Sequence, residues 1–231
     1  GFEMGVSRPE VIRRVIDGVE QEPYESLLID CEETHQGPIM EEMGKRRGEL
    51  RDMVPDGKGR VRLEYMIPSR GIIGFRNQFL TMTSGTGVLN SIFDHYGPVK
   101  AGEVAARQNG VLVSMVAGKV LAYALFALQE RGRLFIGPNI EVYEGQLIGI
   151  HSRDNDLAVN PTKGKQLTNV RAAGSDENIL LTPPIRMSLE QALDFIDEDE
   201  LVEVTPQSIR LRKKLLKEVE RRRAGRREAS E

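Results

Sequence analysis

The hydrophobic pattern changes twice between residues 60 and 99, and each change predicts a new element. Apolar residues first occupy alternate positions, which is the period of a half-buried strand: Val61, Leu63, Tyr65 and Ile67. They then recur at spacings of three and four, the pattern of one helix face: Ile72, Phe75, Phe79 and Met82. Pro68 ends the strand and Ser69 is the predicted N-cap of the helix, which the glycines of residues 83–87 end before a strand at 88–93.

The preceding residues complete a compact unit. Leu27, Ile29 and Cys31 alternate with their neighbours as in a strand, and Gly37-Pro38 opens a helix. A short strand follows at residues 50–54, and residues 55–59 have the chemistry of a turn. The order β-α-β-β-α-β is that of a ferredoxin-like domain, a four-stranded antiparallel sheet with two helices on one face. We therefore predict such a domain over residues 23–100.

The second half is richer in short strands. Residues 100–106 are a candidate linker, and an apolar, strand-like segment follows at 110–115. One helix face is indicated by Leu121, Ala124, Leu125 and Leu128. Further short strands are predicted at 134–136, 140–143, 146–150, 179–181, 201–204 and 209–211, whereas residues 152–177 show no sustained period. Ser188 and Gln191 form a predicted capping box at the start of a helix. We predict a mixed, strand-rich α+β domain over residues 107–215.

Several long runs of this sequence resemble one protein family. The run IPSRGIIGFRNQFLTMTSGTGVLNSIFDHYGPV, residues 67–99, resembles domain V of the elongation-factor-G-like translational GTPases, and its first part is similar to the TypA/BipA branch. Three runs of the second half resemble the C-terminal domain that is special to TypA/BipA: NGVLVSMVAGKVLAYALFALQERGRLFIGP, YEGQLIGIHSRDNDLAVNPTKGKQLTNVRAAGSDE and PPIRMSLEQALDFIDEDELVEVTPQSIRLRK. The resemblance implies a C-terminal fragment of such a GTPase.

The two ends fall outside these domains. Phe2, Met4 and Val6 alternate as in a strand, either as an arm packed on the next domain or, as the resemblance implies, as a remnant of domain III. In the second case residues 1–22 hold a strand without its original partners, which would be mobile or would pair elsewhere. Residues 216–231 are a basic tail that we predict to be disordered.

Charge is unevenly distributed along the chain. The formal net charge is only −3, but acidic residues gather between positions 190 and 203 and basic residues at the C-terminus, so local patches say more than the total. Cys31 is the single cysteine, which excludes an internal disulfide and fits a reducing cytoplasm. No apolar run approaches the ~20 residues of a membrane span, so no membrane partner is expected.

The chain has no motif for nucleotide chemistry. A P-loop requires a second glycine followed by Lys and Ser or Thr, and neither Gly118-Lys119 nor Gly164-Lys165 meets the pattern. The resemblance implies that GTP and Mg²⁺ bind in an upstream domain, so we expect this fragment to need no cofactor and to be no enzyme. A hydrolytic cluster of His151 and Asp154 is the weaker reading of a turn rich in Asn and Asp.

The segment 152–175 is the main candidate site. It combines flexible backbone with four cations suited to phosphate: Arg153, Lys163, Lys165 and Arg171. A solvated surface loop is the alternative from chemistry alone, and the resemblance implies contact with large-subunit ribosomal RNA and the acceptor end of A-site transfer RNA. The loop carries no aromatic residue, so base stacking is not expected from it. The basic tail is a second candidate for RNA binding. Arg70 and Arg76 are a third, and the resemblance implies that they face ribosomal RNA.

These observations predict a ribosome-docking module. The resemblance implies a parent that is a ribosome-associated GTPase acting in translation, large-subunit assembly and adaptation to stress and cold. The alternative is a free-standing regulator that binds a small ligand on its ferredoxin-like domain, because fold does not fix function. The docking hypothesis expects no small-molecule substrate and binding that weakens steeply with salt.

Overall fold

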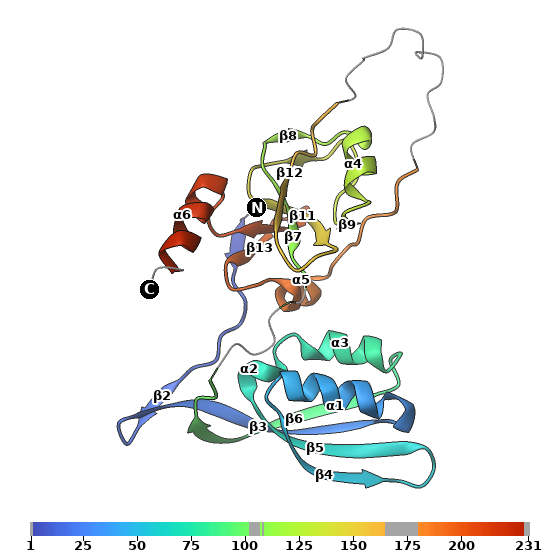
Figure 1. Ribbon diagram of the computed structural model, residues 1–231, viewed down its shortest axis with the longest axis vertical. Coiled ribbons are helices and arrows are strands. Elements are labelled where there is room, and N and C mark those ends of the chain that lie inside the picture. Colours follow the sequence, from blue (N-terminus) through green and yellow to red (C-terminus); the bar gives the residue numbers. More distant parts are fainter. Residues whose placement is uncertain (1, 102–106, 108, 165–179, 229–231) are drawn as a thin grey trace. The chain divides into compact units, whose positions relative to one another are not determined.

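The computed structural model describes residues 2–101, 107, 109–164 and 180–228 (Figure 1). Contacts divide the chain into two units. The ferredoxin-like unit comprises Pro9–Ala106 with Leu193–Phe195, and the C-terminal unit comprises Gly1–Arg8, Arg107–Ala192 and Ile196–Glu231. No helix among the described residues is both long and apolar enough to cross a membrane.

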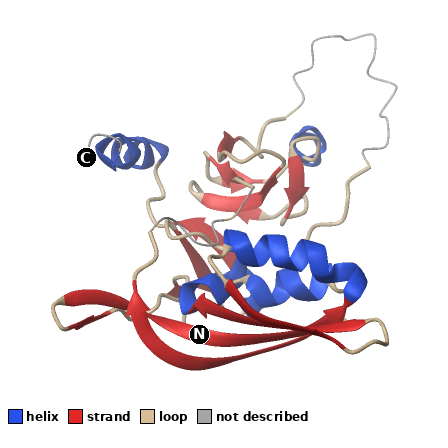
Figure 2. Cartoon of the chain, turned by 60° about the horizontal axis from the view of Figure 1, so that its bottom comes forward, coloured by secondary structure: helices blue, strands red, loops and turns tan. Residues whose placement is uncertain are grey.

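The ferredoxin-like unit has one antiparallel sheet. Its elements are β2 (Arg14–Ile16), β3 (Val19–Glu32), the 3-10 turn η1 (Glu33–His35), α1 (Gln36–Lys45), β4 (Glu49–Pro55), β5 (Arg60–Pro68), α2 (Ser69–Ile72), α3 (Phe75–Met82) and β6 (Val88–Pro98). The order is β4-β5-β3, with β6 on the other side of β3 and β2 paired to its first residues. The helices cover one face of the sheet (Figure 2). The α+β, ferredoxin-like fold predicted from the sequence is confirmed.

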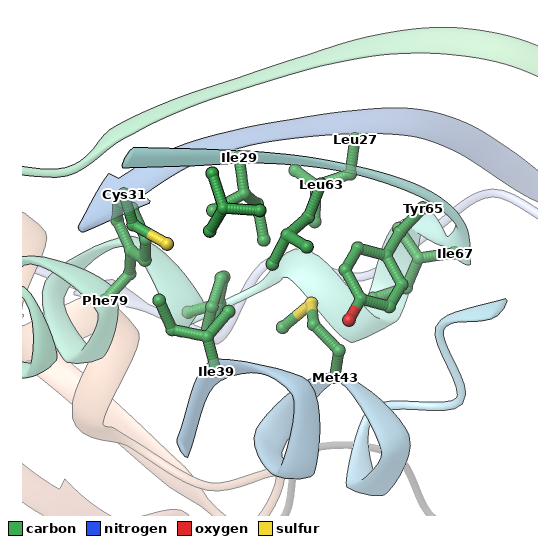
Figure 3. Packing of buried hydrophobic residues seen from close by; sticks show 11 residues of the cluster. Leu27, Ile29, Cys31, Ile39, Met43, Leu63, Tyr65, Ile67 and Phe79 are labelled. Carbon is green, nitrogen blue, oxygen red and sulfur yellow. The ribbon is translucent and has the colours of Figure 1, made fainter. Parts of the chain in front are cut away.

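The core of this unit lies between the sheet and its helices (Figure 3). The alternating residues of β3 and β5 point inward, since Leu27, Ile29 and Leu63 are fully buried, and they pack with Ile39 and Met43 of α1. Phe75 and Phe79, one α3 turn apart, complete the cluster. Each such side chain contributes roughly 1.5–3 kcal/mol on burial, so the two periodic patterns are what stabilise the fold.

The helix predicted as continuous after Pro68 is in fact two. Ser69 is not a side-chain cap, because α2 starts at Ser69 itself, and the chain turns at Gly74, whose φ of 73° is left-handed, before α3 begins. The guanidinium of Arg46, at the end of α1, donates to the carbonyls of Gly71 at 2.8 Å and Ile73 at 3.1 Å. A buried cation therefore satisfies carbonyls that the interruption leaves open.

The C-terminal unit is built on short strands. Its elements are β1 (Met4–Val6), β7 (Val111–Ser114), β8 (Gly118–Lys119), α4 (Ala122–Leu128), β9 (Gly132–Leu134), β10 (Glu141–Val142), β11 (Gln146–His151), β12 (Leu157–Val159), α5 (Leu189–Phe195), β13 (Glu200–Val204), β14 (Ile209–Lys213) and α6 (Glu218–Glu228). The main sheet has the order β1-β13-β14-β11-β7-β12, with β9 also on β11, and β8 pairs with β10. This confirms the mixed, strand-rich domain.

The first strand pairs with a partner from the far end of the sequence. β1 lies antiparallel to β13, with Met4 opposite Val204 and Val6 opposite Val202. A strand without its original partners was expected either to be mobile or to pair elsewhere. The second outcome is observed, since β1 pairs with β13. The pairing extends the main sheet at its edge.

Several local predictions meet different outcomes. The capping box is confirmed, because the Ser188 hydroxyl accepts from the Gln191 N–H and the Gln191 side chain accepts from the Ser188 N–H. Residues 152–177 were predicted to have no regular structure, but β12 forms among them and pairs in parallel with β7. Leu180 and Leu181 are not in a strand, contrary to the predicted strand at 179–181, whose first residue lies outside the described part.

The prediction of a disordered tail after residue 215 is wrong for its described part, which forms α6. The Glu144 carboxylate accepts the N–H of Glu218 at 3.0 Å and so caps the first turn. Glu218 also pairs with Arg222 one turn further on. Acidic residues at the N-terminus and arginines at the C-terminus both suit the helix dipole, a local effect that the overall basic composition conceals.

Candidate nucleic-acid interface

The backbone that leads into the predicted RNA-binding segment is fixed by the sheet. The Val159 carbonyl, at the end of β12, accepts from the N–H of Met115 at 2.9 Å. The Pro161 carbonyl accepts from the N–H of Leu121 at 3.1 Å, immediately before α4. Residues 160 and 161 therefore lie beside the start of α4.

A turn held by one side chain follows at once. The Asn160 side-chain oxygen accepts from both the N–H and the hydroxyl of Thr162, at 2.9 and 2.8 Å. Lys163 comes next and is exposed. Lys163 thus directly follows an ordered turn.

Residues 180–182 lie at the other end of α4. The side-chain nitrogen of Gln129 donates to the Leu180 carbonyl, and its oxygen accepts from the Thr182 N–H, both at 3.0 Å. Because Leu121 and Gln129 flank α4, the residues on each side of 165–179 are held at the two ends of one helix.

Arg153 occupies a second fixed turn of the same unit. Its side chain is exposed, while its carbonyl accepts from the Gly110 N–H at 2.8 Å. Within this turn the His151 ring nitrogen Nδ1 lies 2.6 Å from the Asn155 carbonyl. The Asp156 carboxylate accepts the Val111 N–H at 2.9 Å, so the backbone of the turn is tied to β7 at both ends.

These contacts favour the turn over the hydrolytic reading of residues 151–156. The His151 side chain is buried and faces a backbone carbonyl, whereas Asp154 is exposed. No group of three or more His, Cys, Asp or Glu side chains within the described residues could hold a metal ion. His151 is thus a structural residue of the turn.

The predicted cations fall into three sets. Arg153 and Lys163 are exposed on the C-terminal unit, and Arg76 is exposed on α3 of the ferredoxin-like unit. Arg70 belongs to the same unit but is largely buried. Lys165 and Arg171 lie outside the described residues.

Arg70 serves the interior of its own unit. Its guanidinium donates to the carboxylate of Glu22 at 2.6 Å and to the carbonyl of Lys100. The Glu22 side chain is fully buried and also accepts the Lys100 N–H at 2.8 Å. Burial, and next the Glu22 charge, raise the pKa of neighbouring Tyr24. Arg70, in α2, therefore holds Glu22 and the residues that follow β6, and its guanidinium is not an exposed group of the kind expected for an RNA contact.

A buried cluster of charges, which the sequence reading missed, anchors the C-terminal unit. Arg107 donates two hydrogen bonds to the Glu200 carboxylate, at 2.7 and 3.0 Å. The ammonium of Lys213 lies 2.9 Å from Glu200, 2.6 Å from Asp156 and 2.8 Å from Asp199. These members come from the linker end, the 152–156 turn and both strands of the β13–β14 hairpin, so the cluster joins segments distant in sequence.

The pKa values of the cluster show how strongly its charges are coupled. Burial alone would raise the pKa of Glu200, but the hydrogen bonds from Arg107 and the charge of Lys213 lower it below the usual value. Burial would likewise lower the pKa of Lys213, but Glu200, Asp156 and Asp199 raise it. Both residues are therefore charged at neutral pH.

Helix α6 presents a row of cations. Arg222, Arg223 and Arg226 are exposed on its last two turns, and at 100° per residue they share one side of the helix. Arg221 is different, because it donates to the carbonyls of Leu215 and Leu216 and so fastens the start of the helix. The second candidate from the sequence is thus an ordered basic helix.

An open groove lies on the C-terminal unit, and not on the ferredoxin-like domain where the alternative hypothesis expected a small ligand. Apolar and polar residues share its lining, among them Phe135, Leu147, Ile185, Arg186 and Arg210. Arg210 donates to the Ser208 hydroxyl at 3.2 Å, which holds it within the β13–β14 turn.

Comparisons with known families place both units. The family model described as elongation factor G C-terminus matches residues 19–107. The model described as TypA/BipA C-terminal domain matches residues 109–218, which cover almost all of the C-terminal unit that follows the linker. The chain carries the C-terminal domains of the TypA/BipA family. The family predicted from the sequence is therefore confirmed.

TypA/BipA relatives match over nearly the whole chain. The Haemophilus influenzae protein named large ribosomal subunit assembly factor BipA is 66% identical over 226 residues, covering 98% of this chain and 37% of its own length. The protein of the same name from Escherichia coli K12 is 65% identical with the same coverage, and that from Buchnera aphidicola is 54% identical over 230 residues, 38% of its length. The chain thus spans little more than a third of these relatives.

Proposed function

We propose that this TypA/BipA chain docks its parent protein on the large ribosomal subunit through contacts between exposed cations and RNA phosphates. The name of the relatives, large ribosomal subunit assembly factor, supports the partner. The observation that carries the proposal is the pair Arg153 and Lys163, whose side chains are exposed while the backbone beneath each is hydrogen-bonded to the sheet or to α4. Because the backbone beneath these cations is already ordered, binding a phosphate orders only their side chains.

The proposal extends to finer contacts. Lys165 and Arg171 follow in the same segment and would add phosphate contacts, and the acceptor end of A-site transfer RNA is the proposed neighbour. Arg76 and the arginines of α6 would meet other ribosomal RNA phosphates. Arg70 is left out, because Glu22 and Lys100 already engage its guanidinium.

The role of the parent protein is part of the same proposal. Hydrolysis of GTP, with its Mg²⁺, would belong to the part of the relatives that this chain does not span. The chain itself would contribute binding and no chemistry. The expected setting is the cytoplasm, where the protein would act in translation, large-subunit assembly and adaptation to stress and cold.

Co-sedimentation with purified ribosomes and isolated large subunits across a salt series tests the proposal. The logarithm of the affinity should fall linearly with the logarithm of the salt concentration. A variant with Lys163, Lys165 and Arg171 changed to Ala should bind more weakly, with a slope shallower by roughly one unit for each phosphate that the variant no longer neutralises.

A matched variant controls for the change in charge. Arg51, Lys58 and Arg62 are exposed on the ferredoxin-like unit, and changing these three to Ala removes the same charge from a surface with no proposed contact. The docking proposal is wrong if the wild-type chain fails to sediment with ribosomes at low salt. The site assignment is wrong if both triple variants bind alike. Binding of a small ligand to the ferredoxin-like unit, together with no binding to ribosomes, would instead support the regulator hypothesis.

A further inference from the structure

Helix α4 has an unusual outer face. Its seven residues, AYALFAL, include no charged side chain, and Ala124, Leu125 and Leu128 bury the inner face. Tyr123 and Phe126, three residues apart on the opposite side, remain 44% and 43% exposed. A surface helix normally turns polar residues outward, so an aromatic outer face indicates a binding surface.

The surroundings of this face are largely basic. Lys119 is exposed in β8, two residues before Leu121, and Arg131 is exposed just beyond the end of the helix. Lys163 is exposed next to Gly164, where a side chain would lie 3.7 Å from the Leu121 methyl. Acidic neighbours are fewer: Glu130 precedes Arg131, and Glu141 stands opposite Lys119 in the β8–β10 pair.

We infer that Tyr123 and Phe126 form a stacking platform for unpaired bases of RNA, with Lys119 and Lys163 meeting the phosphates that join them. The inference rests on the proposed docking function and names the kind of RNA that this site would take. Exposed aromatic rings beside cations are the common means of holding single-stranded nucleic acid, because every base offers a flat face. A base inside a duplex is already stacked and cannot use the platform.

Charge decides between RNA and an apolar protein partner. Charged residues are depleted at the core of a protein interface, whereas the three cations Lys119, Arg131 and Lys163 outnumber the two carboxylates near these rings. The described residues on either side of the segment proposed to contact phosphates are also held at the two ends of this helix, by Leu121 and Gln129. Stacking was not expected from the sequence, since the loop lacks aromatic residues. The structure supplies them from the neighbouring helix.

A single tryptophan reports directly on this platform. The chain contains no tryptophan, so Phe126→Trp introduces one fluorophore at an exposed position. Adding single-stranded poly(A) should quench its emission through stacking, whereas the poly(A)·poly(U) duplex at equal phosphate concentration should not. Met53→Trp, on the 44% exposed Met53 of β4, is the control and should respond to neither. Equal quenching of both positions, or no quenching of the fluorophore at position 126, overturns the inference.

Removal of the rings gives the complementary test. Tyr123→Leu with Phe126→Leu keeps an apolar helix former at both sites but removes the flat faces. This variant should bind poly(A) about tenfold more weakly than wild type, with the same salt slope and the same affinity for the duplex. The thermal midpoint should be unchanged, because neither ring is in the core.

The outcomes separate this inference from the docking proposal. If the double leucine variant binds poly(A) as wild type does, while the wild-type chain still sediments with ribosomes in a salt-dependent way, the platform is wrong and docking stands. If the wild-type chain binds neither ribosomes nor any RNA, both are wrong. A variant that loses ribosome binding but not poly(A) binding assigns the aromatic face to a protein partner and overturns the inference.

Discussion

The cations of this chain work in two contrasting ways. Arg107 and Lys213 of the C-terminal unit, like Arg46 and Arg70 of the ferredoxin-like unit, are buried or nearly so and are engaged by carboxylates or carbonyls of their own unit. Arg153 and Lys163, in contrast, are exposed above fixed backbone. The number of basic residues in the sequence cannot distinguish the buried cations from the exposed ones. Position in the fold separates a cation that stabilises the protein from one that is free to bind a polyanion.

The largest expected effect comes from removing the central carboxylate of the buried cluster. Glu200→Gln removes the carboxylate that binds the Arg107 guanidinium twice, while Lys213 keeps Asp156 and Asp199, and it should lower the unfolding free energy of the C-terminal unit by about 3 kcal/mol. Hydrogen exchange of the β13 and β14 amides measures this destabilisation locally.

Glu203→Gln is the control for this prediction. Glu203 is partly exposed on the same strand, lies 3.9 Å from Arg210 and accepts from the Tyr143 hydroxyl at 2.8 Å. The side-chain oxygen of Gln can keep that hydrogen bond, so the loss of the charge should cost less than about 1 kcal/mol. Equal exchange rates in the two variants would show that the buried cluster adds no more than a surface pair, and the contrast between the two kinds of cation would fail.

A smaller difference in stability is expected between variants of Arg70 and Arg76, which the sequence analysis named as one candidate site. Arg70→Met removes the guanidinium partner of the buried Glu22, which keeps its hydrogen bond from the Lys100 N–H, and should destabilise the ferredoxin-like unit by about 2–3 kcal/mol. Arg76→Met removes an exposed cation and should change stability by less than about 0.5 kcal/mol.

Urea unfolding of both variants, with ribosome co-sedimentation beside it, checks this contrast. Arg76→Met should reduce binding without loss of stability. A destabilised Arg76 variant, or an Arg70 variant as stable as wild type, would reverse the roles assigned to the two residues.

The smallest expected effect is the change in stability of the buried cluster with pH. The pKa of Glu200 is lower in the folded state than its usual 4.5, so its contribution is present above pH 4.5 and is lost as pH falls through the lower folded value. The pKa of Lys213 is raised above 10.5, so its contribution is full below 10.5 and is lost only as pH rises through the higher folded value. Exchange of the β13 amides should therefore be flat between these limits after correction for intrinsic rates. A maximum within the plateau would contradict the assignment.

The sequence predicted what depends on local periodicity. Alternation in β3 and β5 and the spacing of Phe75 and Phe79 identified the ferredoxin-like core, because one buried face imposes its period on each element. The capping box at Ser188 was equally local. The interruption at Gly74 was missed because the group that stabilises it, Arg46, lies on another helix.

The candidate site shows the same division. The cations Arg153 and Lys163 were found from composition and exposure, both of which the sequence suggests. The aromatic rings Tyr123 and Phe126 were read as part of a helix, since only the fold brings α4 to the base of the loop. The Arg107–Glu200–Lys213 cluster gave no signal, because its members are scattered along the chain and meet only in three dimensions.

The pairing of β1 with β13 has a consequence for synthesis on the ribosome. Residues 19–98 can collapse into their own core as soon as they leave the exit tunnel, because the sheet and the buried cluster of the ferredoxin-like unit form within that stretch. Met4, made before them, waits until Val204 has emerged. Strand β1 is thus placed only after β13 has been made, and closing so long a loop makes the edge of the C-terminal sheet a late and slow step of folding.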